Sequence, residues 1–187
     1  MKIILATVVA ATLAILVWGY YATKTGSVQI LKGAVKLTDE KITLSGVKLI
    51  EKKNNKPIME LMADRSTIAL DESVTNLEDF TLVSYSEKMD DITLTAEKGV
   101  MVNSTHDITA SGNVLVRDAS GRALATDTLR WINSERKMIT DTFVWIFGDN
   151  FVINGRGMVA KPDDETFELL NDVRLTFKPG HKKQILR

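Results

Sequence analysis

The stretch Ile92-Thr93-Leu94-Thr95-Ala96 places apolar and polar residues in strict alternation. Successive side chains of a β-strand point to opposite faces, so this pattern predicts a strand with one buried and one solvated face. Residues 42–49, 113–117 and 173–177 alternate in the same way. Because no helical period lies between these stretches, we expect antiparallel sheets and an all-β fold.

Short polar clusters separate the alternating stretches, at residues 54–57, 118–121, 147–150 and 161–164. They predict turns between strands of about six residues. The clusters are too short to divide two domains. We therefore expect one β-domain at residues 41–178, preceded by a linker at residues 25–40 and followed by a basic tail at residues 179–187.

The β-region contains an internal repeat. Each unit has a small residue within an alternating strand, then a polar turn, then a second strand that opens on a β-branched or aromatic residue. The small residues Ala63, Ala96, Thr126 and Gly155 lie 33, 30 and 29 residues apart, and each second strand opens 17 or 18 residues later. Such a unit cannot bury its own face and must stack on its neighbours. We expect an elongated, folded-over pair of sheets with unpaired strands at both ends.

The last expected strand, residues 167–177, would leave one sheet edge open. Open edges attract further strands unless charges, prolines or bulges block them. This strand carries Glu168, Asp172 and Arg174, and Pro179 follows it. Two interpretations stay open: a partner sheet docks here by strand addition, or the domain simply ends.

Residues 3–22 carry no charge, and a helix needs roughly 20 apolar residues to cross a bilayer. Trp18, Tyr20 and Tyr21 end this segment, and such aromatic residues favour the headgroup boundary. We expect residues 1–24 to form an uncleaved transmembrane anchor. A signal peptide would have a shorter apolar core and an A-x-A site, and a buried soluble helix is the remaining alternative. We place the N-terminus inside, because only two residues precede the helix and long domains translocate largely regardless of charge.

The composition argues against several functional classes. The chain has 24 basic and 24 acidic residues, so no electrostatic footprint for nucleic acid is present. Cysteine is absent, which excludes disulfides, thiolate metal sites and cysteine nucleophiles. His106 lies in a polar turn, and the carboxylate pairs Asp90-Asp91 and Asp163-Asp164 lie in expected loops. We expect no catalytic site, no metal and no cofactor.

The apolar interior is the remaining candidate site. Ordinary core packing is the first interpretation of its large residues, which include Phe143, Trp145 and Phe147 together with Trp131 and Phe151. The second interpretation is that a sheet pair open along one side accommodates acyl chains, which requires no catalytic residue.

Several motifs, taken in order behind an N-terminal anchor, resemble the LptC family of lipopolysaccharide export proteins, which is related to OstA/LptA-like periplasmic jelly rolls. They lie at residues 55–64, 94–99, 112–116, 123–131, 139–144 and 155–158. The resemblance implies a twisted open β-jelly roll of antiparallel strands, preceded by one transmembrane α-helix. It also implies a single-pass protein of the cell inner membrane with its C-terminal domain in the periplasm.

The resemblance further implies a non-enzymatic lipopolysaccharide transfer protein. It would receive lipopolysaccharide from an inner-membrane ABC transporter complex of the LptB/LptF/LptG type and pass it to a periplasmic bridge protein of the LptA type. The implied lipid-binding residues are the inward apolar ones, assigned through the alternation: Leu61, Ala63, Phe80, Leu82, Leu94, Ala96, Val114, Val116, Val144, Ile146, Val173 and Leu175. The implied docking edge consists of Phe167, Leu169, Val173, Leu175 and Phe177.

Two alternatives remain at this point. A membrane-anchored periplasmic scaffold would bind only protein partners by β-strand addition and would have a closed core. An anchored carbohydrate-active enzyme would need facing carboxylates or a metal site, and the sequence offers neither pattern.

Overall fold

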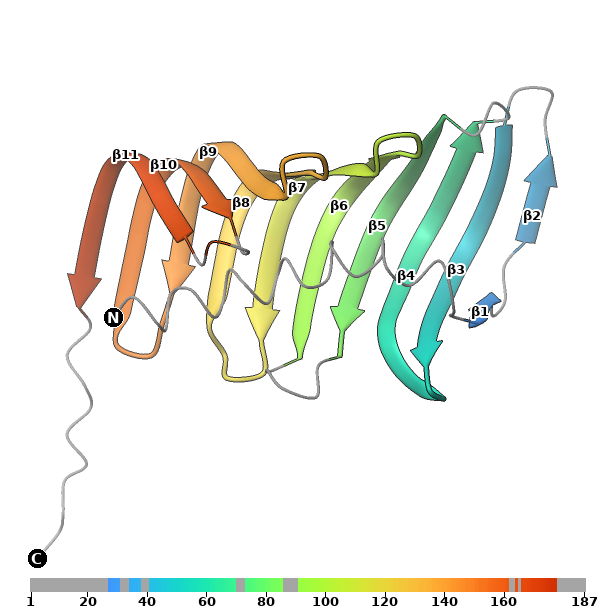
Figure 1. Cartoon of the computed structure of the whole chain (residues 1–187), viewed down its shortest axis with the longest axis horizontal. Helices are drawn as coiled ribbons and strands as arrows, with labels where there is room; N and C mark the ends of the chain where they lie inside the picture. Colours follow the sequence, from blue (N-terminus) through green and yellow to red (C-terminus); the bar gives the residue numbers. More distant parts are fainter. Residues whose placement is uncertain are drawn as a thin grey trace, which may run out of the picture.

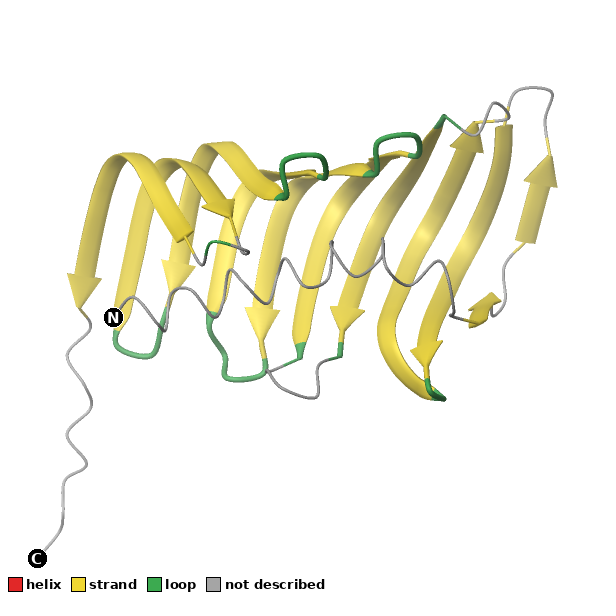
Figure 2. Cartoon of the chain, viewed as in Figure 1, coloured by secondary structure: helices red, strands yellow, loops and turns green. Residues whose placement is uncertain are grey.

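The strands of this protein form a single antiparallel sheet, as a computed structural model shows (Figure 1). The structure describes residues 27–30, 34–37, 41–69, 73–85, 91–161, 164 and 166–177. No element in these ranges is helical, as Figure 2 shows. The predicted anchor, residues 1–24, and the tail, residues 179–187, lie outside them. Within the described part of the chain, no helix has the length and apolar character required to span a bilayer. The strands are β1 (Ser27–Ile30), β2 (Ala34–Leu37), β3 (Lys41–Lys53), β4 (Lys56–Ala69), β5 (Val74–Ser84), β6 (Ile92–Val102), β7 (Asp107–Asp118), β8 (Ala123–Ile132), β9 (Lys137–Phe147), β10 (Phe151–Lys161) and β11 (Thr166–Phe177).

Strands β3 to β11 are ordered in the sheet as they are in the chain. Short turns join most neighbours. Between β3 and β4, Asn54 and Asn55 adopt positive φ angles of 52° and 64°, a conformation that Asn tolerates better than most residues. The segment predicted as a linker contains β1 and β2, which both pair with β3 at separate positions. At the opposite end, β11 pairs with β10 alone among the described strands.

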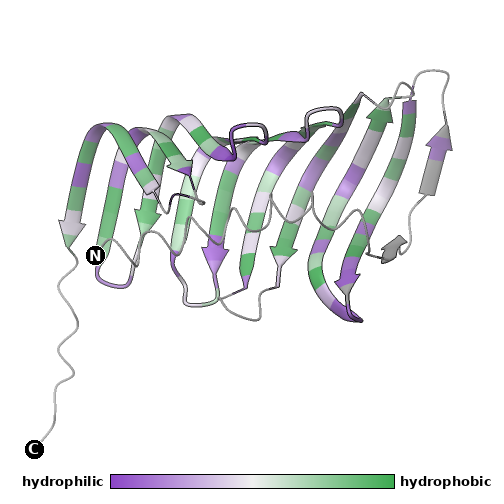
Figure 3. Ribbon diagram, viewed as in Figure 1, coloured by the Kyte–Doolittle hydropathy of each residue, from purple (hydrophilic) through white to green (hydrophobic). Residues whose placement is uncertain are grey.

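The register aligns apolar residues into a continuous row across the sheet, which we call the long apolar row. It takes one residue from each strand from β3 to β11, and its central members are buried. Figure 3 shows the alternation of hydrophobic and hydrophilic residues along the strands that produces such rows. The members of the long apolar row are Leu49, Leu61, Leu82, Leu94, Val116, Leu124, Ile146, Ile153 and Leu175.

In most of the strands, the alternation of inward and outward side chains shifts by one residue near the middle of the strand. In β6 the inward side chains are those of residues 92, 94 and 96, and then of residues 99 and 101. The register shifts at the same place, between Thr95 and Lys98. Glycine, Asp or Asn residues with positive φ lie at comparable points of other strands, among them Gly46, Asp79 and Gly157. The strands bend there, since a bulge both kinks a strand and turns its side chains over.

The bend corrects one prediction from the sequence. Strands of about six residues were expected, whereas β3 to β11 have 10 to 14 residues. Each long strand consists of two alternating halves, and the phase change between them resembles a strand end in the sequence. The two halves of the sheet face each other, and residues from both halves form a single core cluster.

The four repeat anchors mark this bend. Ala63, Ala96, Thr126 and Gly155 are each the last inward residue before it. After the first three anchors the next buried position follows three residues later, at Ser66, Gly99 and Leu129; after Gly155, both Gly157 and Met158 are buried. Little room exists at these points: a Cβ atom on Gly155 would lie 3.0 Å from the backbone oxygen of Asn171. Each repeat unit is therefore a bent β-hairpin. Its small residue allows the backbones of neighbouring strands to lie close together at the bend.

Candidate functional site

The interior between the two half-sheets contains most of the predicted lipid-binding residues. Nine of the twelve are buried, and Leu61 packs against them. Val173 and Leu175 lie on the same face, but they are 57% and 39% exposed, because β11 pairs with β10 alone among the described strands. The nine buried ones are Ala63, Phe80, Leu82, Leu94, Ala96, Val114, Val116, Val144 and Ile146.

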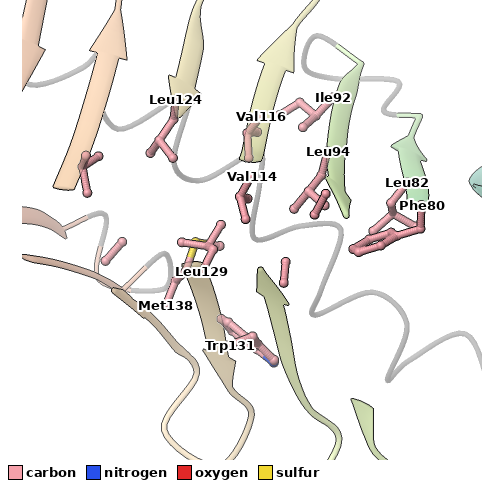
Figure 4. Close-up of a cluster of buried hydrophobic side chains, with 14 of the residues drawn as sticks. Phe80, Leu82, Ile92, Leu94, Val114, Val116, Leu124, Leu129, Trp131 and Met138 are labelled. Atoms are coloured by element: carbon pink, nitrogen blue, oxygen red, sulfur yellow. The ribbon is translucent and has the colours of Figure 1, made fainter. Parts of the chain in front are cut away.

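All of these predicted residues belong to one half of the sheet, and the facing half was missed. In the facing half, the inward residues that lie farthest from the bend form a second continuous row, which we call the distal row. In Figure 4, Leu129, Trp131 and Met138 lie on one side of the core cluster, and Leu82, Leu94, Val116 and Leu124 on the other. The signal that could have found the second half is the spacing of three residues between each repeat anchor and the next inward position. The distal row comprises Ile42, Ile68, Thr75, Met101, Ile108, Trp131, Met138, Ala160 and Phe167.

Polar residues occupy the margin of the other half-sheet, beyond the long apolar row. Glu51, Ser84 and Asp118 are buried there, in register with Met59 and Ile92. Desolvation by burial raises the pKa of the Glu51 carboxyl. This margin of the interior thus alternates polar and apolar side chains, whereas the long apolar row behind it has apolar side chains alone.

The Asp118 carboxylate has partners in the β7–β8 turn. It accepts a hydrogen bond of 2.9 Å from the backbone N–H of Arg122 and forms an ion pair with the same residue's guanidinium. These contacts satisfy a buried charge that would otherwise be costly. Asp118 therefore closes a turn at the margin of the interior.

Two aromatic residues that were predicted to pack in the core lie outside it. Phe143 and Trp145 are 44% and 42% exposed, and their ring centroids lie 6.4 Å apart. Between and beyond them, Val144 and Ile146 point inward and are buried. The reason is the period of the strand: β9 is apolar on both faces, and only alternate residues can reach the interior. Trp131, in contrast, is buried as predicted.

The predicted docking edge coincides with β11, the terminal strand of the sheet. Phe167 and Leu169, at its start, are half-buried against the core. Val173, Leu175 and Phe177 are exposed, and Phe177 is the most exposed of them at 67%. Because no described strand pairs with the other side of β11, its exposed apolar side chains lie along an open edge, where a further strand can be added.

The sequence was compared with known proteins. The family model described as "Lipopolysaccharide-assembly, LptC-related" matches residues 6–178. The chain belongs to the LptC family. Membership gives it a role in lipopolysaccharide transport, and the matched residues include all the strands of the described sheet.

A solved structure with a similar arrangement is LptH from Pseudomonas aeruginosa, described as the LptA homologous periplasmic component of the conserved lipopolysaccharide transport device. It is 7% identical to this LptC-family chain, and the TM-score is 0.42. The similarity covers 82% of this chain and 96% of LptH. No curated protein matches the sequence.

Proposed function

We propose that this LptC-family protein is a non-enzymatic transfer protein. It receives lipopolysaccharide from an inner-membrane ABC transporter complex of the LptB/LptF/LptG type and passes it to a periplasmic bridge protein of the LptA type. The observation that carries the proposal is the long apolar row, which crosses nine strands without a polar interruption and reaches the exposed side chain of Leu175 on the terminal strand.

An apolar row of this kind suits acyl chains and needs no chemical step. Burial of each methylene group contributes about 0.8 kcal/mol, so several acyl chains would hold the lipid between the half-sheets. Equivalent apolar positions recur at every strand, which lets a lipid move along the row without losing contact with apolar surface.

The exposed end of the row supports transfer to a second sheet. A strand added to β11 would bond to its free backbone groups and extend the row beyond Leu175. The lipid would then cross from one protein to the next over a continuous apolar surface.

The proposal places the protein in the inner membrane. Residues 3–22 would form the single transmembrane anchor, with the β-domain in the periplasm. The anchor would keep the lipid-receiving end of the domain next to the membrane that supplies the lipid.

The test is site-specific photocrosslinking to lipopolysaccharide in cells. A photoreactive amino acid at the inward Leu94 or Val144 is expected to crosslink to the lipid. The matched controls are the next residues of the same strands, Thr95 and Trp145, which point to the outer face. Crosslinks of equal strength at inward and outward positions would show that the interior does not hold the lipid.

A scaffold that binds only proteins is the second candidate. The observation that favours it is the tight packing at the centre of the interior, where Val116, Val144 and Met158 have no exposed surface. Uptake of lipid A by the purified full chain separates the two functions: the transfer protein binds it, and the scaffold does not.

A further inference from the structure

The indole of Trp131 carries a hydrogen-bond donor for which the described residues supply no acceptor. Trp131 lies on β8 in the distal row and is 1% exposed. Among the side-chain nitrogen and oxygen atoms buried within the described residues, its Nε1 is the one that lacks a hydrogen-bond partner. The indole N–H can only donate, and a buried donor without an acceptor is rare enough in folded proteins to require an explanation.

None of the described residues around Trp131 accepts a hydrogen bond from its indole. Its partners in the register are Ile108 on β7 and Met138 on β9, both apolar. Nearby, the Asn133 backbone N–H donates to Oδ1 of Asp107, the first residue of β7, over 2.9 Å, and Asn133 Nδ2 donates to the Thr105 carbonyl oxygen over 3.1 Å. Phenylalanine would fill an apolar site of this kind without leaving a donor unpaired, so packing against the described residues does not explain the indole N–H.

The position of Trp131 suggests which group would accept a hydrogen bond from its indole N–H. Trp131 lies one residue before the end of β8, at the margin of the interior and away from the bend. A lipid whose tails point toward the bend would place the oxygen atoms nearest its head at this margin, since ester, amide and hydroxyl oxygens lie at the head end of an acyl chain. At the opposite margin, the side chains of Glu51, Ser84 and Asp118 are polar and buried.

We propose that the Trp131 indole N–H donates a hydrogen bond to a hydroxyl or carbonyl oxygen of a bound acyl chain. Trp131 is then a specificity-determining residue that favours oxygen-bearing acyl chains over plain hydrocarbon. This inference rests on the proposed function, because it requires that acyl chains enter the interior. It adds the chemical class of chain that the interior selects.

The test observes the indole N–H directly in the full ¹⁵N-labelled chain, held in alkyl maltoside micelles. The three indole signals, from Trp18, Trp131 and Trp145, are assigned with the variants Trp131→Phe and Trp145→Phe. On addition of lipid A, the Trp131 indole proton is expected to move downfield as the hydrogen bond forms. The Trp145 signal, from the outer face, is expected to stay in place.

Two further probes identify the oxygen: a β-hydroxy fatty acid, and the same fatty acid without the hydroxyl. A downfield shift with the first alone assigns the hydroxyl, and a shift with both assigns the carboxyl oxygen. The variant Trp131→Phe is expected to bind lipid A roughly tenfold more weakly, whereas Trp145→Phe is expected to bind it normally.

The two possible failures differ. If lipid A binds, as shown by crosslinking at Leu94, but the Trp131 signal does not move, the hydrogen bond is absent and this inference is wrong. If lipid A does not bind to the full chain at all, the proposed function itself fails.

Discussion

Gly112 shows how closely single residues are constrained at the bend of the sheet. Its φ angle is 78°, in the left-handed region that favours glycine. A Cβ atom there would lie 2.9 Å from the Cβ of Glu97 on the neighbouring strand. The Glu97 carboxylate also accepts a hydrogen bond from the side chain of Asn113, so it cannot move away without losing that contact.

We therefore expect Gly112→Ala to lower the free energy of unfolding by about 2 to 4 kcal/mol, from backbone strain and collision together. The matched control is Gly121→Ala, where φ is 84° but nothing lies within 4 Å of the added Cβ. That variant is expected to lose only the strain, about 1 kcal/mol. Urea denaturation measures both, and equal losses would contradict a steric role for Glu97.

Glu51 predicts a pH dependence of stability. Burial raises the pKa of its carboxyl above the ordinary value of 4.5, so the folded chain retains a proton at pH values where the unfolded chain has released it. The free energy of unfolding is therefore expected to fall as the pH rises from 4.5 through the raised pKa. Below this window the carboxyl is neutral in both states, and the penalty is absent.

The variant Glu51→Gln is expected to remove this dependence and to be more stable than the parent at neutral pH. Denaturation midpoints measured across the acidic range check it. Glu168→Gln, at an exposed position of β11, is the control and is expected to change little. A less stable Glu51→Gln variant at neutral pH would show that the charged carboxylate is stabilised by a partner.

At the scale of elements, the bent hairpin is the unit from which the sheet is built. Each bend converts one long strand into two halves whose inward residues face each other, so adding a hairpin extends both halves of the interior together. The hydroxyl groups of Thr126 and Thr142, 2.8 Å apart, bridge β8 and β9 at the bend. Such side-chain bonds satisfy polar groups where the regular ladder is interrupted.

The terminal strand β11 leaves most of its side chains exposed. We expect Val173→Lys to weaken the binding of a partner jelly roll at least tenfold, because a lysine on an open edge opposes strand addition. Stability should change by no more than about 0.5 kcal/mol, since Val173 is exposed. The control is Val100→Lys, at an exposed valine of β6 in the middle of the sheet. The affinity of each variant for the partner jelly roll is measured, and an equal loss of affinity in both variants would exclude β11 as the docking strand.

At the scale of the whole molecule, burial rises toward the middle of the sheet and falls at β11. Central residues such as Val116 and Val144 have no exposed surface, whereas every residue of β11 except Phe167 and Leu169 is exposed. In a stack of similar units, each unit is stabilised by its neighbours on both sides, and a terminal unit has only one.

Hydrogen exchange should follow this gradient. Backbone amides of β7 to β9 are expected to exchange slowest and those of β11 fastest, because local opening costs least where few apolar contacts are lost. Addition of a partner jelly roll is expected to slow exchange in β11 selectively. Uniform protection across the sheet would contradict the gradient, and unchanged exchange in β11 would argue against docking there.

The sequence by itself predicted the all-β class, the hairpin repeat and the inward face of one half-sheet. These features depend on local patterns. Alternation with a period of two identifies the buried face of a strand wherever it continues unbroken, as it does from Ile92 to Ala96. The identification of the family rests on the same stretches.

Only the tertiary structure decided which side chains point inward beyond each bend. A bulge of one residue turns the following side chains over, so alternation cannot be extended past it without knowing which residue bulges. For this reason the facing row was not assigned to the site, although Trp131 itself was expected to be buried. The outward positions of Phe143 and Trp145 were not predicted because β9 is apolar on both faces. The exposure of Val173 and Leu175 also depends on the sheet as a whole, because a strand is an edge only when no other strand lies beside it.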